Sequence, residues 1–166
     1  EYREIIKYYS NPVVMEEITK FCRGRWVSLH TQHWSQQFIR YMDRDKKPIT
    51  ISKPEDIRYL LFRFQGLKPR TIYGSVNVYR NLSEYIELDN PENIIYSTPT
   101  WDVDGTLDSW KAIVEIARII IEKIEDEGVS NSVYLKWSGR GIHIHIHEKA
   151  FSNEILSKYH PLDLSY

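Results

Sequence analysis

Two aspartates are the residues of this sequence best suited to metal chemistry. Asp102 and Asp104 are two residues apart in a stretch that predicts a strand, so both side chains are expected on one face of a sheet. Two carboxylates on one face repel each other unless a cation lies between them, and Mg²⁺ or Mn²⁺ prefers such oxygen ligands. The pair predicts a divalent-metal site, although short acidic pairs at strand ends are also common without one.

A glycine-rich turn, residues 138–141, is the second segment with chemical potential. Its small residues, its hydroxyl group, its guanidinium group and its approachable backbone suit the oxygens of a nucleotide triphosphate. An ordinary hairpin turn accounts for Gly-x-Gly without any ligand. The candidate nucleotide-binding residues are Ser138, Gly139, Arg140, Gly141 and His143.

Three histidines alternate with three isoleucines along residues 142–147. The isoleucines are expected to face the core, which leaves three imidazoles together on the opposite face. Such a ladder suits a metal site, a phosphate-contacting surface or an exposed polar sheet face. His143 is the favoured phosphate ligand or metal-adjacent residue. His145 is a further candidate metal ligand, and the role of His147 stays open.

Together the two segments resemble the archaeo-eukaryotic primase superfamily, which includes primase small subunits and primase-polymerases. The matching motifs, separated by a long predicted helix, are Trp101-Asp102-Val103-Asp104 and Ser138-Gly139-Arg140-Gly141-Ile142-His143. The resemblance covers roughly residues 70–150 and does not extend to residues 1–70. It implies a primase-polymerase catalytic core with an RRM-like sheet.

The resemblance implies template-directed, metal-dependent nucleotidyl transfer of the DNA primase or primase-polymerase type. Asp102 and Asp104 would hold Mg²⁺ or Mn²⁺, while Ser138, Arg140 and His143 would contact the triphosphate. The implied partners are nucleoside triphosphates, a single-stranded DNA template or primer-template, and a large primase-type subunit. The implied setting is archaeal-type DNA replication in the cytoplasm.

The sequence departs from the family pattern where a third metal-binding carboxylate is expected. The only acids after the histidine segment are Glu148, Glu154 and Asp163. Either the chain is truncated at its C-terminus before the third acid, or it keeps the nucleotide site without full activity. A catalytically degenerate nucleotide or nucleic-acid binding module therefore stays open as an alternative, as does a metal-dependent phosphoesterase.

Periodicity predicts the elements that must position these residues. Helices are expected at 12–22, at 52–66 with a capping box formed by Ser52 and Glu55, at 108–127 and at 152–159. Strands are expected at 25–31, 36–42, 48–51, 71–80, 94–104, 132–137 and 142–147, with an irregularity at Pro99. This pattern predicts an α+β fold in which helices flank a mixed or antiparallel sheet.

The 166 residues have the length of one compact domain. We expect an N-terminal α/β part, residues 1–70, as a candidate for nucleic-acid contact, and a metal- and nucleotide-binding core at 71–166. Residues 1–80 carry 15 Lys/Arg and 8 Asp/Glu, whereas residues 81–166 carry 7 and 15. A basic half suits a phosphate backbone and an acidic half suits cations, although chance segregation explains the same numbers.

Basic and aromatic residues alternate in the N-terminal half. They are expected to follow a template strand through phosphate contacts and base stacking, unless the tryptophans are core residues and the charges lie in a solvated turn. These residues are Arg23, Arg25, Trp26, Trp34, Arg40, Tyr41, Arg44, Lys46 and Lys47.

The single cysteine, Cys22, excludes an internal disulfide and a zinc site built from several thiolates, which fits a reducing cytoplasm. No apolar stretch reaches the roughly 18 residues that a membrane span needs. We therefore expect no membrane partner.

Overall fold

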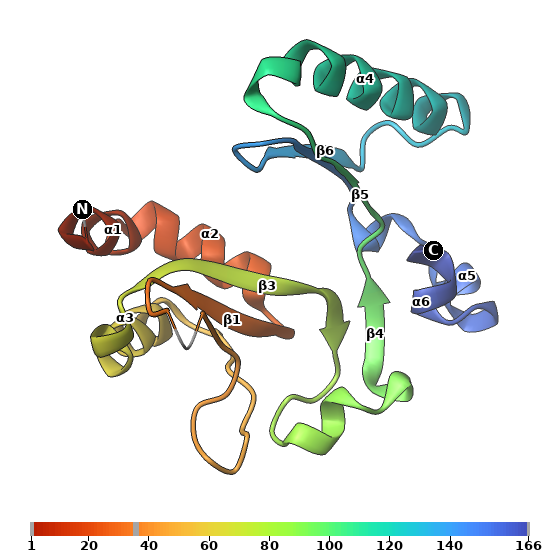
Figure 1. Ribbon diagram of the computed structural model, residues 1–166. Helices are drawn as coiled ribbons and strands as arrows, with labels where there is room; N and C mark the ends of the chain where they lie inside the picture. Colours follow the sequence, from red (N-terminus) through yellow and green to blue (C-terminus); the bar gives the residue numbers. More distant parts are fainter. Residues whose placement is uncertain (1, 35–36, 166) are drawn as a thin grey trace. The chain divides into compact units, whose positions relative to one another are not determined.

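The computed structural model describes residues 2–34 and 37–165, and within these ranges it contains six α-helices and seven strands (Figure 1). The strands form two sheets, with the orders β2-β1-β3-β4 and β5-β7-β6. The predicted α+β class is confirmed. By its internal contacts the chain divides into two compact units, Glu1–Ile95 and Tyr96–Tyr166, which we call the N-terminal and C-terminal units.

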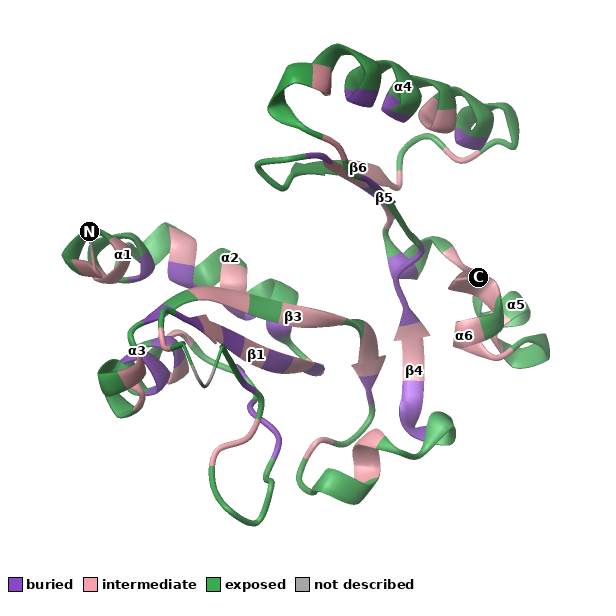
Figure 2. Ribbon diagram, in the orientation of Figure 1, coloured by how far each residue is buried: buried purple, intermediate pink, exposed green. Residues whose placement is uncertain are grey.

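The N-terminal unit packs three helices against one face of its sheet. Strand β1 alternates buried and half-buried residues (Figure 2). Its buried residues Val27 and Leu29 belong to the core that the helices share with the sheet. Strands β2 and β3 flank β1 in antiparallel orientation. The elements are α1 (Tyr2–Tyr9), α2 (Pro12–Cys22), β1 (Arg25–Thr31), β2 (Phe38–Ile39), α3 (Pro54–Arg63), β3 (Pro69–Tyr79) and β4 (Ile94–Ser97), which crosses the unit boundary.

Local hydrogen bonds define where two helices of this unit begin. The Asn11 side chain accepts a hydrogen bond from the Val13 amide and caps α2, as an Asn in this position typically does. At α3 the predicted acidic partner is wrong, because Asp56 rather than Glu55 is the acceptor. Its Oδ2 accepts from the Ser52 amide at 2.9 Å, the Ser52 hydroxyl at 3.0 Å and the Lys53 amide at 3.1 Å.

The C-terminal unit packs one long helix against a three-stranded antiparallel sheet. Helix α4 buries Ile113, Ala117 and Ile124 against Val103 and Ile144, and its opposite side is exposed (Figure 2). None of the described helices is long and apolar enough to cross a membrane. The elements are β5 (Thr100–Val103), α4 (Trp110–Asp126), β6 (Val133–Trp137), β7 (Ile142–Ile146), α5 (Asn153–Lys158) and α6 (Pro161–Ser165).

Three strand predictions need correction. Residues 94–104 form two strands in different sheets, because the chain is interrupted at Thr98-Pro99 between β4 and β5. Residues 36–42 give only the short β2, and position 36 lies outside the described residues. Residues 48–51 make isolated bridges rather than a strand.

Two further features differ from the prediction. Helix α1 was not predicted. Strand β3 lies in the N-terminal unit, whereas the sequence pattern grouped it mainly with the second part of the chain.

Candidate metal and nucleotide site

The glycine-rich turn joins β6 to β7 as a tight hairpin. The Ser138 amide donates to the Gly141 carbonyl at 2.9 Å, and the Gly141 amide donates to Ser138 Oγ at 3.0 Å. Gly139 and Arg140 form the two-residue loop, and Gly139 has a φ of +97°, which favours glycine at this position. The predicted hairpin is confirmed, and its short loop determines which residues of β6 and β7 lie opposite one another.

Strand β7 is the middle strand of this sheet, and it brings the two motifs together. Asp102 of β5 lies opposite His143 of β7, and His143 Nε2 lies 3.2 Å from Asp102 Oδ1. On the other side of β7, Lys136 of β6 lies opposite His143. Because directly opposed residues share a sheet face, these three side chains form one row that runs carboxylate, imidazole, ammonium.

Gly141 lies against the end of β5, one row beyond this carboxylate. A Cβ atom at position 141 would collide with the Val103 carbonyl oxygen and would lie 3.0 Å from both the Cα and the Oδ1 atom of Asp104. Only a residue without a side chain permits this approach. Asp104 is exposed, and none of the described residues hydrogen-bonds to its carboxylate. The structure thus brings Asp102, Asp104, Gly141 and His143 to one corner of the sheet.

The histidine ladder faces away from α4, as its alternation predicts. Ile144 is fully buried, and its neighbouring isoleucines on β7 pack against the same core. The imidazoles of His143 and His145 lie on the opposite face, half-buried, with their ring centroids 5.9 Å apart. This face of β7 is therefore a polar surface next to the two aspartates.

His145 is engaged with its neighbours in the next row. The Thr100 hydroxyl lies 3.0 Å from the Thr98 carbonyl oxygen, to which it donates, and 2.9 Å from His145 Nδ1, so that Nδ1 is engaged within the sheet. The ring also stacks on Tyr134, with centroids 4.8 Å apart. Metal binding by His145 would therefore have to use Nε2.

The donor set at this corner suits one hard cation whose remaining ligands come from elsewhere. Mg²⁺ is commonly held by one or two carboxylates together with substrate phosphates and water, and Asp102 and Asp104 supply that number. Within residues 2–34 and 37–165, no group of three or more His, Cys, Asp and Glu side chains is arranged to hold a metal. The two aspartates therefore fit a cation delivered with a phosphate ligand and do not fit a closed protein cage.

None of the three later acids contributes a third carboxylate to this corner. Glu148 is buried and accepts a hydrogen bond from the Thr98 hydroxyl at 3.0 Å. It lies five residues after His143 along and beyond β7, which is roughly 16 Å for an extended chain. Glu154 pairs with Lys158 at 2.7 Å, and Asp163 is exposed on the short helix α6.

The tip of the turn is exposed, whereas the Ser138 hydroxyl already forms hydrogen bonds within the turn. Arg140 is exposed, and none of the described groups pairs with its guanidinium group. The Ser138 hydroxyl donates to the Gly141 carbonyl at 3.2 Å. Contact with a phosphate through Ser138 would require that hydroxyl to turn its proton away from the carbonyl, since a hydroxyl has a single proton to donate.

Of the basic and aromatic candidates in the N-terminal unit, Arg25 has another role, and Trp34 lies outside the core. Arg25 is buried, and its guanidinium group donates to the carbonyls of Phe21, Ser75 and Val76 at 2.8–2.9 Å. It therefore ties α2 to β3 and does not face a template. Trp34 is 86% exposed and stacks on His33, so it is not a core residue.

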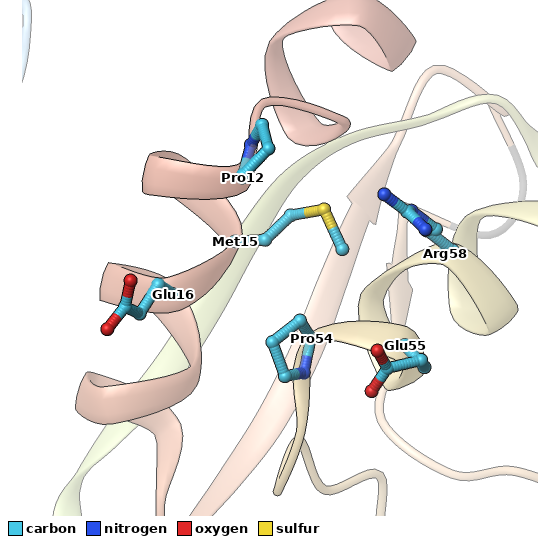
Figure 3. A pocket seen from close by; sticks show the side chains of 6 residues that line it. All are labelled: Pro12, Met15, Glu16, Pro54, Glu55 and Arg58. Atoms are coloured by element: carbon cyan, nitrogen blue, oxygen red, sulfur yellow. The ribbon is translucent and has the colours of Figure 1, made fainter.

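A hollow of about 460 Å³ lies in the N-terminal unit between α2 and α3 (Figure 3). Its lining combines two carboxylates, one guanidinium group and the side chain of a buried methionine, and none of the predicted metal or nucleotide ligands contributes to it. The candidate site is thus an open corner of a sheet and is separate from this hollow. The lining residues are Pro12, Met15, Glu16, Pro54, Glu55 and Arg58.

Sequence reasoning did not select Lys136, Thr100 or Tyr134, which contact or oppose the histidines. A usable signal existed, because a two-residue hairpin loop sets the register and places Lys136 opposite His143 and Tyr134 opposite His145.

No protein-family model matches the chain, and no curated protein sequence matches it significantly.

Proposed function

We propose that this chain is a primase-polymerase-type nucleotidyltransferase and that its C-terminal unit binds the metal–nucleotide complex. The observation that carries this proposal is the meeting of two sequence motifs at one corner: Gly141 lies directly against Asp104, and His143 lies 3.2 Å from Asp102. Neither motif is specific by itself. The two motifs approach each other at Gly141, a position at which no larger residue fits. This close approach favours one shared site over two unrelated turns.

Each side chain has a distinct part in the proposed site. Asp102 and Asp104 hold Mg²⁺ or Mn²⁺, and His143 orients the Asp102 carboxylate through its Nε2 atom. Arg140 and the amides at the tip of the turn contact the triphosphate oxygens. When bound, the cation offsets the charge of the triphosphate and favours the deprotonated form of an attacking 3′-hydroxyl.

The test is primer extension and de novo synthesis on single-stranded DNA with Mn²⁺ and labelled nucleotides, comparing the native protein with Asp102→Ala. Loss of a ligand to the reacting phosphates is expected to reduce extension by roughly 100-fold or more. Asp108→Ala is the matched control, because Asp108 is an exposed aspartate shortly after the site. Equal extension by the native protein and Asp102→Ala would reject the metal-ligand role.

A second candidate, a binding module without catalysis, is favoured by one observation. In the described part of the chain no third carboxylate joins Asp102 and Asp104. This module would bind nucleotide in the presence of Mn²⁺ and lose that binding in Asp104→Asn, yet extend no primer. Isothermal titration with a non-hydrolysable nucleotide measures the binding that both candidates require, and primer extension separates them, since only the first candidate requires it.

A further inference from the structure

The sheet of the N-terminal unit has one face that its three helices do not use. Val27 and Leu29 of β1 face the helices, so the alternating residues Trp26 and His30 face the other way. The strand register adds two further aromatic rings to that side, because Phe38 of β2 lies opposite His30 and Tyr73 of β3 lies opposite Ser28.

Aromatic rings gather on this side in two groups. In the first, the Phe38 ring lies 4.9 Å from His30 and 6.0 Å from Tyr73, measured between ring centroids. The Arg40 guanidinium group lies 5.0 Å above the Phe38 ring. These rings are tilted against one another by 53–55°, so neighbouring rings do not cover each other's faces.

The second group continues from the first. Trp26 lies 5.5 Å from Tyr41, which lies 5.9 Å from Tyr85, and Lys46 is placed 4.9 Å from the centre of the Tyr85 ring. The Trp26 indole nitrogen donates to the Arg40 carbonyl at 2.9 Å, which joins the two groups. We call the combined surface the aromatic face; its residues are Trp26, His30, Phe38, Arg40, Tyr41, Lys46, Tyr73 and Tyr85.

The rings remain accessible, and two of them have a cation beside them. Tyr73, Phe38 and Tyr85 are 45%, 39% and 38% exposed. None of the residues in the four strands β1–β4 is an aspartate or glutamate. The loop after β2 carries Arg40, Arg44, Lys46 and Lys47 beside Asp43 and Asp45, whereas the segment around Tyr85 is acidic and carries Glu84, Glu87 and Asp89.

We propose that the aromatic face binds single-stranded nucleic acid, with bases stacked on the exposed rings and phosphates contacted by Arg40 and Lys46. Every base has a π-face, so tilted and separated rings beside cations suit an extended strand of any sequence. A paired duplex hides those faces and is not expected to bind equally well. This site lies entirely in the N-terminal unit and does not rest on the metal and nucleotide site proposed above.

The test is fluorescence anisotropy of a labelled oligothymidine with the full chain, in EDTA and without nucleotide. The double variant Phe38→Leu/Tyr73→Leu removes two exposed rings and keeps apolar side chains on the sheet. Stacking of each base on a ring is worth enough that we expect binding to weaken by roughly ten-fold or more. Phe62→Leu is the matched control, because Phe62 is an exposed ring on α3 in the helical layer, and it is expected to bind as the native protein does.

Salt dependence gives a second measurement that does not rely on the ring variants. For single strands, each phosphate contact contributes roughly 0.7 to the slope of log affinity against log salt. The variant Arg40→Gln/Lys46→Gln should therefore lower the magnitude of the slope by about 1.4. An unchanged slope would remove Arg40 and Lys46 from the site.

Three results would overturn the proposal: no binding of oligothymidine by the native protein, native affinity in Phe38→Leu/Tyr73→Leu, or equal loss in Phe62→Leu. Thermal unfolding of each variant shows whether a loss of binding reflects loss of the fold. Asp104→Asn is expected to bind oligothymidine normally. Failure of the metal site and failure of the aromatic face are therefore distinguishable.

Discussion

The two units differ most in the number of buried residues that form their cores. In the N-terminal unit, helices α1, α2 and α3 together cover the sheet, and the core contains eleven buried apolar residues, from Tyr9 to Leu61. In the C-terminal unit one long helix covers the sheet, and among its described residues the core contains five, of which only Ile144 is fully inaccessible. The unit that carries the candidate chemistry is thus the one with the smaller core.

The reason lies in how α4 meets its sheet. The buried residues of α4 pack on Ile144 of the middle strand β7 and on Val103 at the end of β5, whereas other apolar side chains of the two flanking strands stay exposed, namely Trp101, Leu135 and Trp137. Strand β7 therefore contributes to both surfaces of the sheet, because its isoleucines belong to the core and its histidines form the polar face. A substitution on one face of β7 is therefore expected to disturb the other face. In the N-terminal unit three helices back the sheet, so a substitution on the aromatic face is expected to disturb the core less.

Truncation of one core residue in each unit gives the largest expected effect. Ile144→Ala and Leu29→Ala should each cost about 3 kcal/mol of unfolding free energy, because both side chains are fully buried. Ile144→Ala removes one of only five core residues, so hydrogen exchange measured by mass spectrometry should rise throughout residues 96–166. Leu29→Ala should leave partial protection in residues 2–95. Similar protection losses in both variants would contradict the difference in core depth.

Two glycines of one hairpin provide a smaller and more local test. Gly141→Ala places a methyl group against the Val103 carbonyl, and overpacking of this kind costs about 2 kcal/mol. Gly139→Ala meets no atom within 4 Å and carries only the strain of its positive φ, about 1 kcal/mol. We expect nucleotide binding to be lost in Gly141→Ala and to fall less in Gly139→Ala, which keeps the amides at the tip of the turn. Thermal unfolding and nucleotide titration measure both quantities, and native nucleotide affinity in Gly141→Ala would argue against a site at this corner.

Local signals in the sequence predicted the strand and the hairpin that carry the candidate site. The alternation of residues 142–147 indicated the two faces of β7, and the short Gly-Arg loop indicated the hairpin. The same reasoning was incomplete at residues 94–104, where it predicted one strand with an irregularity at Pro99 and not two strands. Thr98 and Pro99 separate two strands that join different sheets, and strand membership depends on distant pairing partners that no local pattern encodes.

The remaining differences have the same physical origin. Nothing near Arg25 in the sequence indicates that its guanidinium group is buried against carbonyls about fifty residues away. Similarly, the close approach of Gly141 to Asp104 joins segments almost forty residues apart, and only the fold reveals it. By contrast, the position of Lys136 opposite His143 followed from the hairpin loop and was overlooked. Short-range geometry was predictable from the sequence, and tertiary contacts were not.

The smallest expected effect concerns the start of α3 in the N-terminal unit. Burial alone would raise the pKa of Asp56, but hydrogen bonds from the Ser52 amide, the Lys53 amide and the Ser52 hydroxyl outweigh it and lower that pKa below its ordinary value. A carboxyl group with a lowered folded-state pKa stabilises the fold above its unfolded pKa of about 4, and this contribution is lost as pH falls through the folded-state value. Asp56→Asn should therefore destabilise the protein by about 1 kcal/mol at pH 7 and by less below pH 4.

Glu55→Gln is the matched control, since Glu55 is exposed and is not the capping acceptor. Chemical denaturation at several pH values measures both variants, and a pH-independent difference for Asp56→Asn would show that the capping contribution does not come from its carboxylate charge.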